Sequence, residues 1–184
     1  VTADEDLLKE RRPFDEIVAW IDNELKEVSN ELPDSYSDGS KFGRATSVMA
    51  LAVRARMLLF AASPLVNGNK DYDGFVNSLG EPLFNTTYDP QKWVKAADAC
   101  KELIDVAHTA GHDLYYEYNE DGSIDPFLSY QNMMFRKTTD GNKEILFARP
   151  DNNHWEYDKH AQPRGTGGNG GLGVTQSLVD AFFM

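Results

Sequence analysis

One segment of the chain, from Val48 to Ala62, limits the possible folds more than any other. Apolar side chains recur in it at helical spacing, at Val48, Leu51, Ala52, Ala55, Leu58, Leu59 and Ala62. Its alanines keep the helix slim, so another helix can approach it closely. Arg54 and Arg56 can cover apolar surface with their stems while their charged heads extend past it. Pro64 then ends the helix, because it disfavours helical backbone at Ser63. The segment predicts a buried helix in a helical packing.

Two other segments have similar stripes and the residues typical of helix ends. Pro13 suits the first turn of a helix, and Pro33 ends the stripe that follows it. That stripe consists of Phe14, Ile17, Val18, Ile21, Leu25, Val28 and Leu32. A third helix is predicted to begin at the cap Asp89 and to close at Gly111. Its predicted buried face consists of Trp93, Ala96, Ala97, Cys100, Leu103, Ile104 and Ala107. We therefore predict an all-α fold of packed helical hairpins.

The order of alanines behind Trp93 is typical of tetratricopeptide-like helices, although no regular repeat is visible. Beyond residue 112 the periodicity fades into a possible short helix at 126–135, a brief strand at 144–149 and a long loop at 150–173. Thr175 is predicted to cap a last helix. We expect one segment, 1–184, with a helical core at about 12–112 and a loop-rich, ligand-side region at about 113–184. Long irregular loops and at most a short strand pair should accompany the helices.

Composition excludes several classes of protein. The chain has 184 residues, of which 41% are hydrophobic, enough for one domain with a core. The net charge of -12 argues against nucleic acid as a partner. No apolar run approaches the roughly 20 residues that span a bilayer. The single cysteine, Cys100, excludes an internal disulfide. Because the chain starts at Val1 and ends on an apolar stretch, we expect it to be a segment of a larger protein.

Four motifs in a fixed order resemble the SusD/RagB family of nutrient-binding outer-membrane lipoproteins. The first is the Gly43-Arg44-Ala45-Thr46 opening, which is followed by the alanine-rich helix and its Ala61-Ala62-Ser63-Pro64-Leu65-Val66-Asn67-Gly68 close. The others are Trp93-Val94-Lys95-Ala96-Ala97 with the later His112-Asp113-Leu114, then Glu144-Ile145-Leu146-Phe147, and Thr175-Gln176-Ser177-Leu178-Val179-Asp180-Ala181-Phe182. His112 stands where the family usually has tyrosine.

The resemblance implies a non-catalytic protein on the outer cell surface that binds a glycan, an oligosaccharide or polysaccharide. It also implies delivery of that ligand to a SusC-like TonB-dependent transporter. Membrane attachment would occur only through an N-terminal lipid anchor that this chain lacks. Two alternatives remain: a peptide-binding member of the same family, and a helical-repeat scaffold for protein interactions.

Motifs for chemistry are weak. The glycine-rich run 165–170 matches a dinucleotide fingerprint in letters, but no strand precedes it, so we expect no cofactor. Segments 69–74 and 117–122 resemble the start of a calcium loop, but both lack its closing glutamate. His108 and His112 have no evident third ligand, so we expect no metal. No nucleophile motif or acid/base pair is identifiable, and we expect no catalysis.

The segment 152–164 is the predicted ligand site. Trp155 and Tyr157 lie among polar residues there, and aromatic rings match the apolar C–H face of a sugar. Asn153, His154 and Arg164 are the predicted hydrogen-bond donors to its hydroxyls. The alternative is that both rings fold back on the helices and cover the core.

Overall fold

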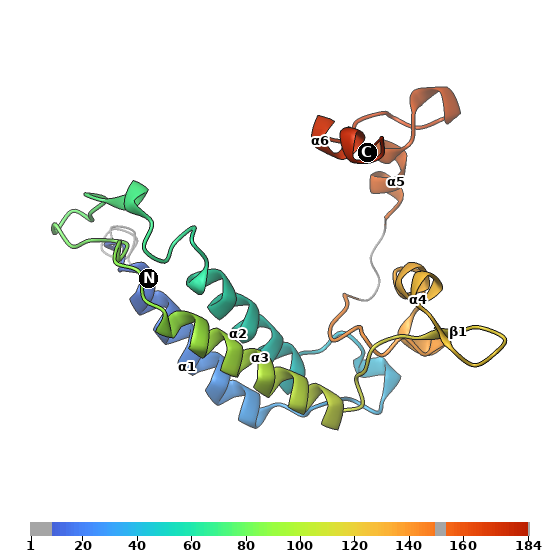
Figure 1. Ribbon diagram of the computed structural model, residues 1–184, viewed down its shortest axis with the longest axis horizontal. Helices are drawn as coiled ribbons and strands as arrows, with labels where there is room; N and C mark the ends of the chain where they lie inside the picture. Colours follow the sequence, from blue (N-terminus) through green and yellow to red (C-terminus); the bar gives the residue numbers. More distant parts are fainter. Residues whose placement is uncertain (1–8, 150–153, 184) are drawn as a thin grey trace. The chain divides into compact units, whose positions relative to one another are not determined.

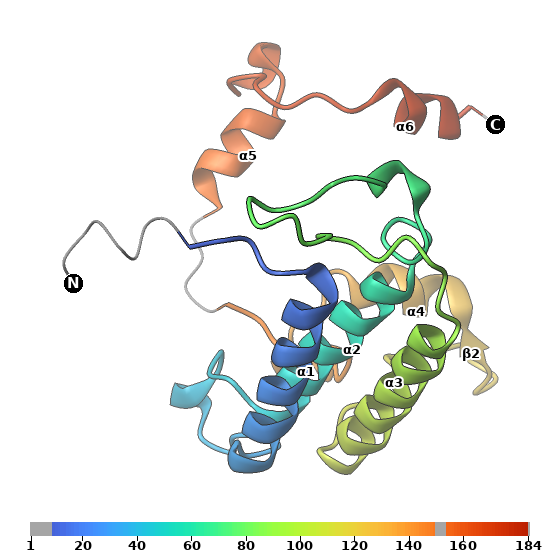
Figure 2. The ribbon, with the colours of Figure 1, turned by 90° about the vertical axis from the view of Figure 1, so that its left-hand side faces the viewer.

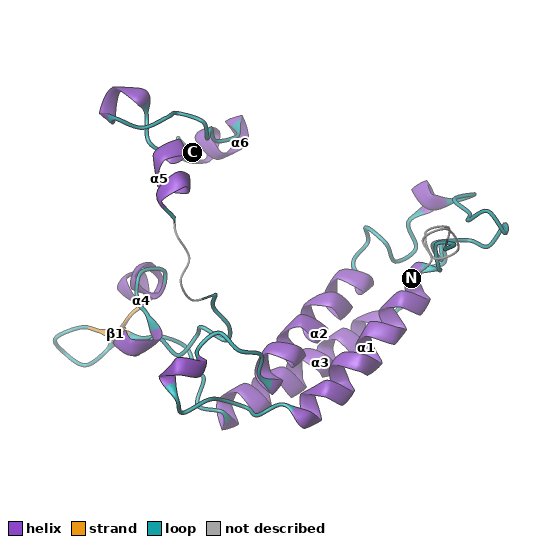
Figure 3. Ribbon diagram, turned by 180° about the vertical axis from the view of Figure 1, so that it is seen from behind, coloured by secondary structure: helices purple, strands orange, loops and turns teal. Residues whose placement is uncertain are grey.

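The computed structural model describes residues 9–149 and 154–183. Two compact units divide between Ala148 and Arg149. The fold is mainly helical, as predicted, with a single pair of two-residue strands in the described ranges (Figure 3).

The first unit contains three long helices, which confirm the three predicted ones (Figure 1). They are α1 (Phe14–Glu31), α2 (Ser47–Ala62) and α3 (Gln91–Thr109). Helix α2 packs against both α1 and α3 (Figure 2). Side chains of α2 and α3 form the main buried cluster, made of Ala55, Leu58, Ala62, Ala96 and Ala99. The four alanines of this cluster are small, which lets the two helices pack closely around Leu58.

The buried side of α1 differs from the predicted stripe. Asp22 and Ser29 are buried, whereas Ile17 and Val28 are each 37% exposed. Arg54 of α2 explains the difference, because its Nε donates to Asp22 Oδ1 across 2.7 Å. Its head therefore lies in the interior, against the expectation that it extends past the apolar surface. A buried carboxylate is tolerated when charged partners bind it.

Helix α3 supplies further charges to the same network. Lys95 Nζ lies 2.5 Å from Asp22 Oδ2. Glu102 Oε2 accepts a hydrogen bond from Arg54 Nη1 at 2.9 Å. The Asp22 carboxylate and the Arg54 guanidinium thus connect α1, α2 and α3.

The end of α2 and the start of α3 are joined by a side chain. Asn67 is buried, and its Nδ2 donates to the carbonyls of Ala62 and Asp89 at 3.2 and 2.9 Å. The Asp89 N–H donates back to Asn67 Oδ1 at 2.9 Å. Gly68 follows with φ +79°, and a Cβ there would lie 2.8 Å from Tyr88 Cα. The Asn67-Gly68 part of the motif therefore has a structural role.

Residues between Asn67 and Asp89 fold onto the N-terminal end of α1. The ring of Phe84 stacks on Tyr72 at a centroid distance of 4.1 Å and on Phe14 at 5.4 Å. The Phe14 N–H donates to the Leu83 carbonyl at 2.8 Å. This irregular stretch is thus a packed part of the first unit.

After α3 the chain forms a small hairpin and a short helix. Strands β1 (Glu117–Tyr118) and β2 (Ile124–Asp125) pair antiparallel, with Glu117 opposite Asp125. Helix α4 (Pro126–Met133) confirms the helix predicted at 126–135. The strand predicted at 144–149 is wrong, since no ladder includes these residues in the described part of the chain. A single extended segment without a partner cannot complete backbone pairing.

The second unit contains α5 (Trp155–Ala161) and α6 (Gln176–Ala181). Thr175 Oγ1 accepts from the Leu178 N–H at 3.3 Å, which confirms the predicted cap. The loop predicted at 150–173 is partly wrong, because α5 and a 3-10 turn, Arg164–Thr166, lie within it. Within the described residues, no helix has the length and apolar character needed to traverse a bilayer.

Candidate functional site

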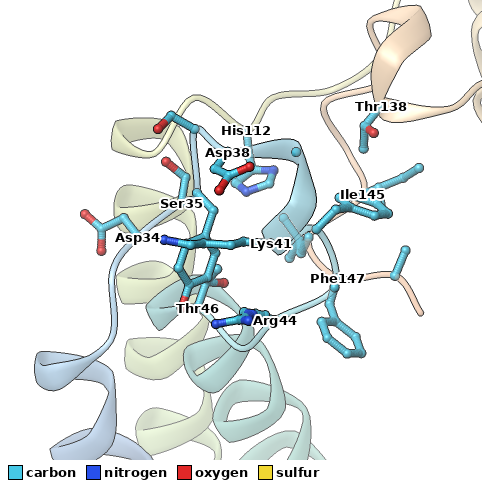
Figure 4. Close-up of a pocket in the computed structure, with 17 residues that line it drawn as sticks. Asp34, Ser35, Asp38, Lys41, Arg44, Thr46, His112, Thr138, Ile145 and Phe147 are labelled. Carbon is cyan, nitrogen blue, oxygen red and sulfur yellow. The ribbon is translucent and has the colours of Figure 1, made fainter. Parts of the chain in front are cut away.

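The first unit has a cavity of about 280 Å³ beside the loop that joins α1 to α2 (Figure 4). Aromatic, aliphatic and charged side chains line it together, among them Tyr36, Asp38, Lys41, Phe42, Arg44, His112, Ile145 and Phe147. In Figure 4, Lys41 and Arg44 extend to one side of the loop, and Ile145 and Phe147 lie on the other wall. Mixed aromatic and polar linings are typical of small-molecule sites.

Local hydrogen bonds hold the loop wall of this cavity. Asp38 Oδ1 accepts from the Ser40 N–H at 2.9 Å and caps the 3-10 turn Gly39–Lys41. Gly43 has φ +84°, which favours glycine at this position. Thr46 Oγ1 accepts from the Met49 N–H at 3.1 Å and caps α2. The Gly43-Arg44-Ala45-Thr46 motif thus has structural reasons for its glycine and its threonine.

The opposite wall is held by a buried amide. Asn142 is 1% exposed, and its Nδ2 donates to the carbonyls of Met133 and Arg136 at 2.8 and 3.0 Å. His112 Nδ1 lies 2.9 Å from the carbonyl oxygen of Lys143. These contacts fix the start of the segment that carries Ile145 and Phe147, so the cavity has ordered walls on both sides.

The charged side chains of the cavity differ in whether other protein groups already bind them. The hydroxyl of Ser47 donates to the Asp34 carboxylate, and Asp38 serves as the cap described above. The Lys41 ammonium lies 5.8 Å from the centroid of the Tyr36 ring. Within the described residues, the Arg44 guanidinium has no hydrogen bond or ion pair, and it is exposed. It is therefore available to a ligand.

The residues predicted for ligand binding lie in the second unit, on and beside α5. Trp155 and Tyr157 are 58% and 68% exposed, so neither ring is buried within this unit. His154 precedes α5, and its carbonyl accepts from the Asp158 N–H at 2.8 Å. Arg164 lies in the following 3-10 turn. Asn153 lies outside the described residues.

The helix changes how the two predicted rings can act. Because successive helical residues are about 100° apart, Trp155 and Tyr157 project from nearly opposite sides of α5. They cannot form one flat platform. The Lys159 ammonium lies 5.0 Å from the Trp155 ring centroid and contacts one face of the indole.

The glycine-rich stretch folds back on α5. Backbone N–H groups of Asn169 and Gly171 donate to the carbonyls of Lys159 and His160 at 2.7 and 3.0 Å. A Cβ at Gly168 would lie 2.2 Å from the Gln162 carbonyl oxygen. Arg164 Nε donates to the Asn169 carbonyl at 3.2 Å. These glycines allow the chain to pack on itself, and Arg164 supports that packing with part of its guanidinium.

The better of the two calcium-like segments is the loop of the β1–β2 hairpin. Asp121 Oδ1 accepts from both the N–H and the hydroxyl of Ser123, at 2.9 and 2.6 Å. Asn119 donates to the same hydroxyl at 3.0 Å. In the described residues, no group of three or more His, Cys, Asp or Glu side chains could hold a metal ion. The oxygen donors here stabilise the turn.

Solved structures can be compared with this chain. The chain is similar to BT4246. The two sequences are 32% identical, the TM-score is 0.63, and the match covers 79% of this chain and 28% of BT4246. Selenomethionine BT4246 gives 34% identity and a TM-score of 0.64, covering 79% of this chain and 29% of that one. This chain thus spans less than a third of either structure. No protein-family model matches it, and no curated protein does.

Sequence reasoning did not find the cavity, because four separate segments line it. One local signal was present: Arg44 follows a glycine and precedes a helix cap, in a position where no structural role requires arginine.

Proposed function

We propose that the chain is part of a SusD/RagB-type protein that binds a glycan at the cell surface without cleaving it. The observation that carries the proposal is the indole of Trp155, which is 58% exposed in a polar surrounding. A large ring in such a place suits the apolar face of a sugar. The ordered motifs support the same assignment.

Contacts around α5 suggest how a sugar would bind. Lys159 lies against the Trp155 indole, and the sugar would stack on the part of the ring that is exposed. Lys159 and His154 are close along the chain and could donate to its hydroxyls. Tyr157 would contact a different part of the ligand from the far side of α5. Asn153 and the remaining N–H groups of Arg164 complete the proposed donors.

The absence of catalysis is also part of the proposal. A general acid for glycoside cleavage needs a raised pKa. The carboxyl groups of Asp38, Glu117 and Asp121 have lowered pKa values instead. The cause in each case is a hydrogen bond, from Ser40, Tyr115 and Ser123 respectively. Such groups stay ionised and are poor proton donors near neutral pH.

Partner and location follow from the family resemblance. We propose that the full-length protein is lipid-anchored at the outer membrane, on the cell-surface side. There it would deliver glycan to a SusC-like TonB-dependent transporter. A pull-down of the full-length protein from outer membranes should recover such a transporter.

The site is tested with one variant and a matched control. A glycan array first identifies a ligand for the 184-residue chain, and calorimetry then measures its affinity. Trp155→Ala should weaken binding by about 2 kcal/mol, roughly 30-fold, with little change in melting temperature. Trp20→Ala removes an indole of similar exposure, 61%, from α1 and should leave affinity unchanged.

Two results would contradict the proposal. Equal affinity in wild type and Trp155→Ala would exclude the assigned site. A complete array without any glycan ligand would exclude the proposed function.

One observation favours the scaffold alternative. Helix α3 exposes Trp93, Val94 and Ile104 by 40%, 51% and 50%, an apolar surface that a protein could cover. If the array finds no glycan and a protein partner is lost on Trp93→Ala, the scaffold function is the better one.

A further inference from the structure

The cavity beside the α1–α2 loop has the composition of a saccharide site and lies apart in sequence from α5. It presents the rings of Tyr36, Phe42 and Phe147 together with groups of both charges. Its volume of about 280 Å³ is close to the lower end of ligand pockets, near 300 Å³, which suits one small unit of a ligand.

We propose that this cavity is a second saccharide subsite, which takes one neutral sugar residue and binds its hydroxyls through Arg44 and Lys41. The inference rests on the proposed function for the class of ligand. A sugar hydroxyl both donates and accepts hydrogen bonds, so a guanidinium, an ammonium and a carboxylate can all serve it. The aromatic rings match the C–H face of the same sugar.

Charge balance favours a neutral sugar over an acidic one. Asp34 and Asp38 offset Lys41 and Arg44 in the lining. A hydrogen bond from Ser40 lowers the pKa of Asp38, so its carboxylate stays ionised at neutral pH. A carboxylate on the ligand would approach these two like charges, which is unfavourable.

The cavity walls are held before any ligand arrives. The hydroxyl of Tyr36 donates to the Ala45 carbonyl at 3.3 Å, and Asp34 accepts from Ser47 at the start of α2. Asn142 holds the opposite segment. A preformed site loses less conformational entropy on binding, which matters for a ligand as small as one sugar ring.

Nuclear magnetic resonance on the isotope-labelled 184-residue chain tests the subsite. The probes are glucose, galactose, mannose and N-acetylglucosamine, with glucuronate as the acidic comparison. At least one neutral sugar should shift the backbone amide signals of residues 36–46 and 145–148. Arg44→Ala should weaken that binding at least 10-fold with an unchanged melting temperature. Arg56→Ala removes the same charge from an exposed position on α2 and should have no effect.

The outcomes separate this subsite from the proposed function. Shifts confined to residues 154–172 would overturn the second subsite and leave glycan binding at α5 intact. Shifts at 36–46 with glucuronate alone would overturn the neutral sugar as its ligand. Shifts at 36–46 that Arg44→Ala leaves unchanged would overturn the role of Arg44. No shift anywhere with any of these single sugars would overturn the second subsite, whereas the glycan array decides the proposed function.

Discussion

The side chains of Asp22 and Arg54 form an ion pair across 2.7 Å in a region almost closed to solvent. Asp22 is 4% exposed as a residue, and the Arg54 side chain is 12% exposed. Lys95 adds a third charged contact from α3. The junction of the three long helices is therefore polar at its centre, although apolar and alanine-rich surfaces surround it.

Loss of the Asp22 carboxylate should destabilise the first unit. We expect Asp22→Ala to lower the free energy of unfolding by about 3 kcal/mol, because Arg54 stays buried with only the more exposed Glu102 carboxylate as its counter-charge. Urea titration measures the change. Asp105→Ala breaks the exposed pair with Lys101 on α3 and should cost far less. Equal losses in the two variants would contradict a special role for the buried pair.

The same pair predicts how stability depends on pH. Burial acts to raise the pKa of Asp22, but hydrogen bonds and positive charge from Lys95 and Arg54 outweigh it and leave the pKa below 3.8. A carboxyl group with a lowered folded pKa stabilises the fold above its unfolded pKa. That stabilisation is lost as the pH falls through the folded pKa.

We therefore expect a constant stability gap between wild type and Asp22→Asn from neutral pH to about pH 5. The gap should shrink below about pH 4. Urea titrations across this range measure it, and comparison with the variant cancels the other carboxyl groups. A gap that persists unchanged at the acidic end would show that the charge of Asp22 is not its source.

The slim side of α2 predicts a response to added volume. Ala55 is 3% exposed in the α2–α3 cluster, and Ala55→Leu should cost about 1–3 kcal/mol through overpacking. Ala52 is only partly buried, so Ala52→Leu should cost less. Thermal unfolding monitored by circular dichroism separates them. Wild-type melting temperatures for both would mean that this side of α2 is not packed.

Gly68 and Gly74 have similar backbone angles, so comparing their alanine variants distinguishes the cost of a steric clash from the cost of backbone strain. Gly68 and Gly74 have φ +79° and +76°, so alanine at either position costs about 1–2 kcal/mol. Only at Gly68 would a Cβ also meet Tyr88, at 2.8 Å. We expect Gly68→Ala to lower the melting temperature clearly more than Gly74→Ala. Equal effects would mean that the backbone angle alone requires glycine at Gly68.

Hydrophobic periodicity located α1, α2 and α3 well but did not identify the buried side of α1. The predicted buried face of α3 is also partly wrong, because Trp93 and Ile104 are 40% and 50% exposed and Ala97 is exposed. Periodicity counts apolar residues, and Asp22 is buried because charges from other helices neutralise it. Those partners are distant in sequence, so no local pattern reveals them. The neighbouring Trp20 lies two residues before Asp22, nearly on the opposite side of the helix, and is 61% exposed.

The candidate sites were harder to predict. Helix α5 is too short for a periodic pattern, so its residues were interpreted as a loop. Trp155 and Tyr157 are exposed within the second unit, and their opposite directions depend on helical geometry, which a loop prediction does not include. The cavity forms only when the fold places Arg44 and Phe147 on its lining, and hydrophobic periodicity does not predict contacts between such distant residues.

The paired hydrogen bonds between Asn67 and Asp89 have a consequence for how this chain can evolve. They join the two ends of the segment 67–89, which therefore forms a closed loop between α2 and α3. The part of this loop near Leu83 is held by α1, but Leu79 is 71% exposed and a Cβ at Gly80 would meet no atom within 4 Å. Residues can be gained or lost at this tip without altering the spacing of α2 and α3. A longer or shorter tip is therefore compatible with the same helical frame.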